Sequence, residues 1–263
     1  MSNRFILPCA AAIAFAAGTT SAQYYQYQLA SVDDEGSLSI DQTNDGGFVT
    51  AGWRKVEDAT GIFNKDFYIV KHNKDGHFQW MNVWGGPEDD VAYSIRQTPD
   101  GGYIIAGESE SFEQNMELVL LRLDAMGNFR WAKAYPHQIN SDTIHHPHAG
   151  VALDLLPNEE IIVTGHYTGH PKLMLTRPDG VPLWQWMYWV PPVNPFIDTP
   201  LHAFTDVDFD RNEGTAVVSG SIEYRVEGPG VVTTHHDAIL MKVDATVGFP
   251  LWYWKYDWPF DRD

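Results

Sequence analysis

Histidines are the residues of this 263-residue chain whose type and grouping most directly suggest chemistry. Nine of the eleven fall between positions 137 and 236, in segments that also carry acidic residues. Neutral imidazole is the commonest protein ligand for transition metals. The chain could therefore hold a transition metal for catalysis or redox chemistry, with His146, His166 and His236 as candidate ligands. The competing interpretation is solvated loop histidines, because the run His-His-Pro-His at 145–148 matches no metalloenzyme spacing.

Acidic residues form a second group with possible metal chemistry. Glu88-Asp89-Asp90 and Asp33-Asp34-Glu35 each precede the first strand of a predicted repeat unit, and oxygen-rich loops can bind Ca²⁺. Asp89 and Asp90 are the candidate Ca²⁺ ligands. Alternatively, these carboxylates accept hydrogen bonds from backbone amides and cap the loop. The acidic run 206–210 alternates with apolar residues, which indicates a strand instead of a Ca²⁺ loop.

Aromatic residues cluster at 184–189 and 252–258. Exposed Trp186 and Trp254 could stack on sugar rings, which would make the protein a lectin. Alternatively, these rings pack between neighbouring repeat units. The chain has no Gly-x-Ser-x-Gly motif, phosphate-binding loop or paired-carboxylate arrangement, so binding is favoured over catalysis.

The elements that must position these residues repeat along the chain. Residues 39–52 and 94–107 share the pattern Ser-Ile-x-Gln-Thr, an Asp-Gly-Gly turn and an apolar strand that ends in Ala-Gly, and degenerate copies occupy 152–165 and 206–220. Each copy predicts a β-hairpin, since Asp-Gly supplies the positive φ that a tight turn needs. No segment has a long amphipathic helical period.

A second apolar strand, another turn and a tryptophan-bearing strand follow each hairpin. The tryptophans are Trp80, Trp131, Trp184 and Trp252, at intervals of 51 to 68 residues. Repeated four-stranded antiparallel units predict an all-β β-propeller of about four blades, with a closed or an incomplete ring. The predicted repeat domain is 23–263, with units near 24–77, 78–128, 129–181 and 182–263.

A meander of four strands sends its loops out at two opposite faces. The Asp/Gly turns fall on one face and nearly all long irregular loops on the other, which is the predicted ligand-binding face because binding residues concentrate on loops of a rigid scaffold. Its candidate residues are His145, His146, His148, His166, His170, His202, His235, His236, Trp186 and Trp254.

Residues 1–22 have the features of a secretory signal: Arg4, an apolar run from Phe5 to Ala17, and small residues before Gln23. They predict a secreted or periplasmic protein without a membrane span, and cleavage would remove Cys9, the only cysteine. A lipid anchor on Cys9 is the alternative, although Cys9 precedes most of the apolar run. The net charge of −18 at pH 7 argues against nucleic acid and anionic membranes as partners.

Residues 85–107, which begin Gly-Gly-Pro-Glu-Asp-Asp, resemble the repeat of secreted bacterial and archaeal β-propeller proteins, and the similarity continues through 121–131. The resemblance implies an extracellular repeat domain, and it weakens in the last two units. The turn at 244–252 is also similar to the tryptophan-docking turn of quinoprotein propellers, where this turn joins neighbouring blades and does not bind the quinone. It implies a fold, not a redox role.

Tyr24 to Leu29 looks like a fifth outer strand, although four blades need only four. Either this strand or an unclosed edge pairs with another chain, or the segment is a frayed terminus or an overlap where the ring closes. The favoured function is a non-enzymatic extracellular binding, structural or assembly module, with an extracellular protein or glycan, or a second copy paired by strands, as partner. The alternatives are a metal-dependent enzyme or redox protein, with Ca²⁺ or a transition metal, and a lectin.

Overall fold

The computed structural model describes residues 34–57, 61–111, 117–135, 151–167, 170–188, 201–228 and 231–256. Sixteen strands in these ranges form four antiparallel sheets, each a meander of four consecutive strands. Within the described ranges the chain has no helix, and hence none that could span a membrane. The predicted all-β architecture of about four blade-like sheets is therefore confirmed.

The strand bounds show the repeat sheet by sheet. The first sheet comprises β1 (Glu35–Gln42), β2 (Phe48–Glu57), β3 (Phe63–His72) and β4 (Phe78–Trp84). The second comprises β5 (Asp90–Gln97), β6 (Tyr103–Ser109), β7 (Glu117–Leu123) and β8 (Phe129–Tyr135). The third comprises β9 (Leu153–Leu155), β10 (Ile161–Tyr167), β11 (His170–Thr176) and β12 (Pro182–Met187). The fourth comprises β13 (Leu201–Asp210), β14 (Thr215–Gly228), β15 (Val231–Asp244) and β16 (Pro250–Tyr256).

The Thr-x-Asp-Gly-Gly signature of the first hairpin has a structural explanation. In the first sheet, Asp45 accepts hydrogen bonds from Thr43 Oγ1 and from the amide of Gly47 and pairs with Lys71 Nζ at 3.0 Å. These donors hold the pKa of Asp45 near 2, with Thr43 as the largest contributor. The second sheet repeats the arrangement around Asp100. The turn therefore ties the first hairpin to the third strand of its own sheet.

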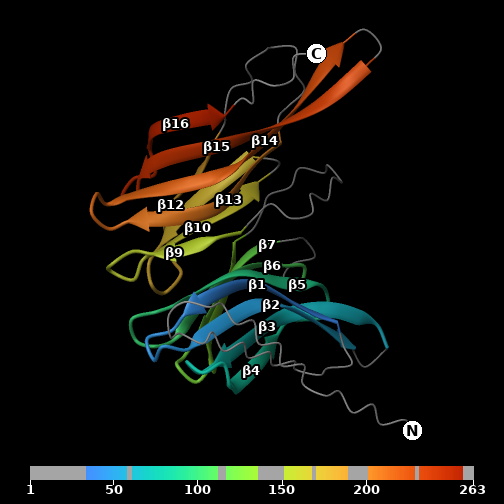
Figure 1. Ribbon diagram of the computed structural model, residues 1–263, viewed down its shortest axis with the longest axis vertical. Helices are drawn as coiled ribbons and strands as arrows, with labels where there is room; N and C mark the ends of the chain where they lie inside the picture. Colours follow the sequence, from blue (N-terminus) through green and yellow to red (C-terminus); the bar gives the residue numbers. More distant parts are fainter. Residues whose placement is uncertain are drawn as a thin grey trace, which may run out of the picture.

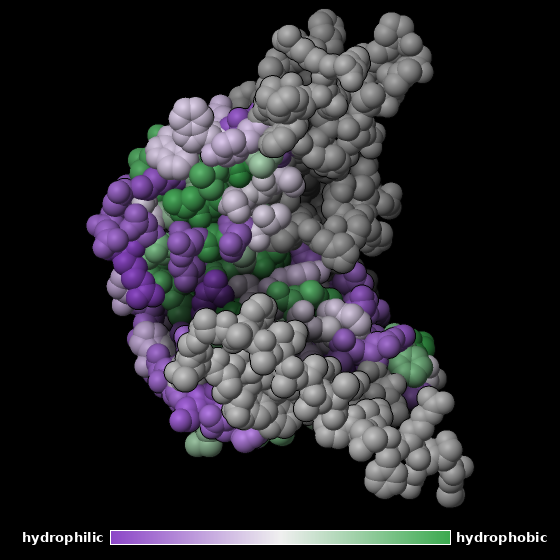
Figure 2. Space-filling model, viewed as in Figure 1, coloured by the Kyte–Doolittle hydropathy of each residue, from purple (hydrophilic) through white to green (hydrophobic). Residues whose placement is uncertain are grey.

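The sheets pack face to face in a stack, with the tight turns along one edge (Figure 1). Three apolar cores fill the spaces between consecutive sheets, the first built around Ile69 and Ile105, the second around Leu120 and Val163, and the third around Leu175 and Met241. Side chains alternate along a strand, so both faces of the two middle sheets are buried. Figure 2 shows hydrophilic residues along the edge where the turns lie, with apolar residues beside them.

The stack is open. The principal contacts between sheets join consecutive sheets only: β1, β2 and β3 touch β5, β5 touches β9, and β9, β10 and β11 touch β13. The first and fourth sheets lie at opposite ends of the stack (Figure 1). Of the chain described, one face of the first sheet and one face of the fourth therefore have no neighbouring sheet. Residues 1–33, including the signal-like segment and Tyr24 to Leu29, lie outside the described residues.

Candidate functional site

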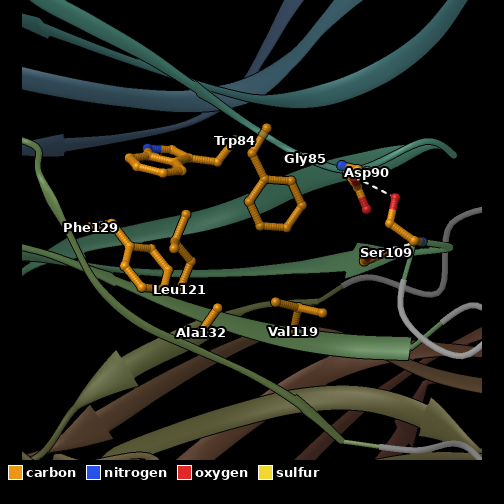
Figure 3. A pocket seen from close by; sticks show the side chains of 11 residues that line it. Trp84, Gly85, Asp90, Ser109, Val119, Leu121, Phe129 and Ala132 are labelled. Carbon is orange, nitrogen blue, oxygen red and sulfur yellow. Dashed lines mark hydrogen bonds between the residues drawn. The ribbon is translucent and has the colours of Figure 1, made fainter. Parts of the chain in front are cut away.

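A pocket of about 320 Å³ lies between the first and second sheets. Its walls are mostly apolar and come from both sheets: Phe67 and Trp84 from the first, and Val119, Leu121, Phe129 and Ala132 from the second. Trp84 and Phe129, whose ring centroids are 5.5 Å apart, stand at one end, whereas Asp90 and Ser109 stand at the other (Figure 3). The pocket thus has an apolar body and one polar end.

Asp90 is the carboxyl group at the polar end of the pocket. Its residue is 2% exposed, and its Oδ2 accepts hydrogen bonds from the Gly86 amide at 2.7 Å and from Ser111 Oγ at 2.9 Å. Its other oxygen, Oδ1, is buried and has no hydrogen-bond partner among the described residues. A buried acceptor without a hydrogen-bond partner carries a desolvation cost.

The loop between β4 and β5 holds Asp90 in place. Asn64 Nδ2 donates to the carbonyls of Gly86 and Glu88 and to Asp66 Oδ1, at 2.8 to 3.0 Å. A Cβ on Gly85 would come within 2.2 Å of Asp66 Oδ1 and 2.7 Å of Asp90 Oδ2. Only glycine can therefore pass between the two carboxylates.

Asp66 is the second carboxyl group near this end. Burial, followed by repulsion from Asp90, raises its pKa to about 6, and the Asn64 hydrogen bond opposes the shift. Two carboxyl groups beside a mainly apolar pocket favour a ligand that brings positive charge. The arrangement suits a primary amine on an apolar body, because the ammonium group would lie beside the Asp90 carboxyl group while the rest fills the apolar part.

The predicted acidic loop makes the backbone hydrogen bonds that its capping interpretation expects. Asp89 Oδ1 accepts from the Lys65 amide at 2.9 Å, and Asp90 accepts from the Gly86 amide. In the described ranges, no group of three or more His, Cys, Asp or Glu residues is arranged to hold a metal ion.

The predicted histidines are only partly within the described chain. His145, His146 and His148 lie outside it, so their role stays a prediction. The backbone of His166 lies in β10 of the third sheet. His202, His235 and His236 lie in strands of the fourth sheet, where β14 separates the strand of His202 from that of the other two.

His170 is the one predicted histidine whose side chain is described. It begins β11, is partly buried, and its Nδ1 has no hydrogen-bond partner among the described residues.

The two predicted tryptophans differ in their surroundings. Trp186 Nε1 donates to the Val247 carbonyl at 2.8 Å, and its ring lies 5.5 Å from that of Phe249, so it contacts the neighbouring sheet as the packing interpretation expects. Trp254 is exposed on β16.

Of the residues that line the pocket, only Asp90 is a candidate site residue in the sequence analysis. Trp84 ends β4, Phe129 begins β8 and Ser111 follows β6, so each belongs to a different part of the repeat. One feature of the sequence could have indicated the pocket. Two glycines and three acidic residues follow Trp84, the last residue of β4, in a segment on the predicted face of the long loops.

No family model matches this chain, and no characterised protein matches its sequence. The solved structures to which it is similar include Drosophila Plexin A in complex with Semaphorin 1b, with 7% identity, a TM-score of 0.42, and coverage of 80% of this chain and 40% of that one. A mannose phosphorylase from Leishmania mexicana has 8% identity and a TM-score of 0.39, covering 82% and 66% respectively. The tail fiber of Staphylococcus aureus phage P68 has 8% identity and a TM-score of 0.28, covering 77% and 49%. The chain thus spans between two fifths and two thirds of these proteins, and such distant similarity carries no information on function.

Proposed function

We propose that this protein is a non-enzymatic extracellular binding module that captures an amine on an apolar body in the pocket between its first two sheets. The observation that carries the proposal is the Asp90 carboxyl group at the polar end of an apolar pocket, one oxygen of which lacks a partner among the described residues. A lysine side chain or an amino terminus of an extracellular protein has this chemistry.

The proposal assigns the protein to the periplasm or the extracellular space. The signal-like sequence of residues 1–22 and the resemblance of 85–107 to secreted repeat proteins support this assignment. In this proposal, the long loops with His145, His146 and His148 widen the contact surface around the bound partner, since they leave the sheets on the same predicted face as the 85–90 loop.

Calorimetric titration with n-hexylamine and with n-hexanol tests the pocket chemistry. The two probes share an apolar chain, but only the amine is charged at pH 7. We expect n-hexylamine to bind more tightly, and Asp90→Asn to weaken it by about tenfold or more while changing n-hexanol little, because a hydrogen bond to a charged group contributes about 1.5–3 kcal/mol.

Asp89→Asn is the matched control, since Asp89 is adjacent and exposed and does not line the pocket. Equal affinity for the two probes, or equal loss of n-hexylamine binding in Asp89→Asn and Asp90→Asn, would contradict the proposal.

A further inference from the structure

One contact between neighbouring sheets recurs three times along the stack. A tryptophan on the fourth strand of each sheet lies against the glycine in the last turn of the next sheet: Trp80 against Gly127, Trp131 against Gly180 and Trp184 against Gly248. A Cβ built on any of these glycines would come within 2.9 Å of the tryptophan ring. Each glycine has a φ between +76° and +80°, so the turn and the ring both require it.

Polar contacts accompany the ring in the same place. The hydroxyl of Tyr135 donates to the Gly180 carbonyl at 2.5 Å, and the hydroxyl of Tyr188 donates to the Gly248 carbonyl at 2.6 Å. Both tyrosines are 6% exposed. The fourth strand therefore carries one half of a repeated contact, and the last turn of the next sheet carries the other half.

A further polar contact joins the first strands of neighbouring sheets. The Gln97 amide donates to Asp41 Oδ2 at 2.8 Å, and the Phe209 amide donates to Asp154 Oδ2 at 2.9 Å. In the fourth sheet the position of Asp41 and Asp154 is occupied by Asp208, which is exposed.

At each end of the stack, one partner of this contact is present without the other among the described residues. In the fourth sheet, Trp252 and Tyr256 occupy the positions of Trp184 and Tyr188, yet they are 39% and 58% exposed. In the first sheet, Gly76 occupies the turn position with φ +78°, and no atom of the described chain lies within 4 Å of a Cβ built there. The exposed Trp252 ring at one end and the uncovered Gly76 turn at the other therefore match the two partners of the contact that recurs within the chain.

We infer that a second copy of this chain docks end to end, with Trp252 of one copy on the Gly76 turn of the other. The contact repeats the three that already join sheets within one chain, so it needs no new surface chemistry. It places the outer face of the fourth sheet against the outer face of the first, where Ile40 and Met81 are exposed although Tyr68 and Val70 are already buried. It differs from strand pairing, because the two sheets meet through their faces and not through their edges. A head-to-tail contact closes a ring of two copies when the rotation fits and otherwise continues as a filament.

Sedimentation of the full chain over a range of concentrations tests the inference. We expect wild type to associate, and either Trp252→Ala or Gly76→Asn to raise the dissociation constant by at least about tenfold, as removal of a central interface tryptophan does. Asparagine tolerates positive φ, so Gly76→Asn fills the space without disrupting the turn. Tyr253→Ala is the matched control, because Tyr253 is exposed on the same strand but on its other face.

Mixing the two variants separates a blocked contact from a damaged fold. Trp252→Ala retains an intact Gly76 turn, and Gly76→Asn retains an intact Trp252, so a mixture leaves one complete contact. We expect the mixture to form a one-to-one pair although each variant alone stays monomeric. A monomeric wild type, association that survives both substitutions, or a mixture that stays monomeric would overturn the inference.

Discussion

Replacing Glu108 with glutamine tests whether the second and third sheets pack face to face. Glu108 lies on β6, and its residue is 3% exposed. Burial raises its pKa to about 7 from an ordinary value of 4.5, although a hydrogen bond with Tyr93 opposes the shift. The folded protein therefore holds this proton more tightly than the unfolded chain does. Glu108 consequently destabilises the fold increasingly as the pH rises from 4.5 through 7.

The size of the effect follows from linkage between protonation and folding. A shift from 4.5 to about 7 costs roughly 3 kcal/mol at pH 8 and roughly 1 kcal/mol at pH 5. Glutamine cannot ionise, so the stability difference between Glu108→Gln and wild type should become more favourable to the variant by about 2 kcal/mol from pH 5 to pH 8. This change with pH does not depend on how well the amide packs.

The assay is urea unfolding of both proteins at pH 5 and pH 8, with Glu57→Gln as the control at an exposed strand end. If the stability of Glu108→Gln follows the wild-type value at both pH values, Glu108 is hydrated and the second and third sheets are not packed as described.

Three further substitutions test single contacts by urea unfolding. Tyr188→Phe removes the hydroxyl that donates to the Gly248 carbonyl and should cost about 1 kcal/mol, and no loss would mean that the hydroxyl does not make this hydrogen bond. Asp45→Asn should destabilise at pH 6 but progressively less as the pH falls from 4 towards 2, because Asp45, whose pKa is lowered in the fold, stabilises the fold only while it is ionised; a pH-independent loss would contradict the lowered pKa of Asp45. Leu120→Ala should cost about 2–5 kcal/mol through a cavity in the second core, and a cost below 1 kcal/mol would mean that this core is loose.

The hairpins were predictable because their determinants are local. Asp-Gly turns and alternating apolar residues specify each hairpin from within about fifteen residues, and Gly46 and Gly101 indeed have positive φ. The tryptophan-bearing fourth strands were also predictable, because the tryptophan recurs once in each repeat unit. At Trp186 the sequence leaves sugar stacking open as an alternative to packing, and the hydrogen bond to the neighbouring turn shows that this ring contacts the next sheet.

The pocket and the free ends depend on which sheets become neighbours. Asp89 and Asp90 are adjacent acidic residues, and the sequence alone does not distinguish them. The path of the chain between β4 and β5 buries Asp90 and leaves Asp89 exposed. Likewise, Gly76 has the same turn signature as Gly127, yet only the latter has a tryptophan against it. Such differences arise from the order of the sheets, which no local pattern encodes.

A distance measurement by electron spin resonance tests most directly whether the contact between sheets continues from one copy to the next. A reference chain labelled at Asn44→Cys and Met126→Cys gives the distance between the first turn of one sheet and the last turn of the next sheet. A mixture of one copy labelled at Arg211→Cys and another at Asp75→Cys probes the same relationship between copies. The account predicts the reference distance in the mixture and its loss when both copies carry Gly76→Asn. A mixture with no such distance, or one in which Gly76→Asn leaves it unchanged, would contradict the account.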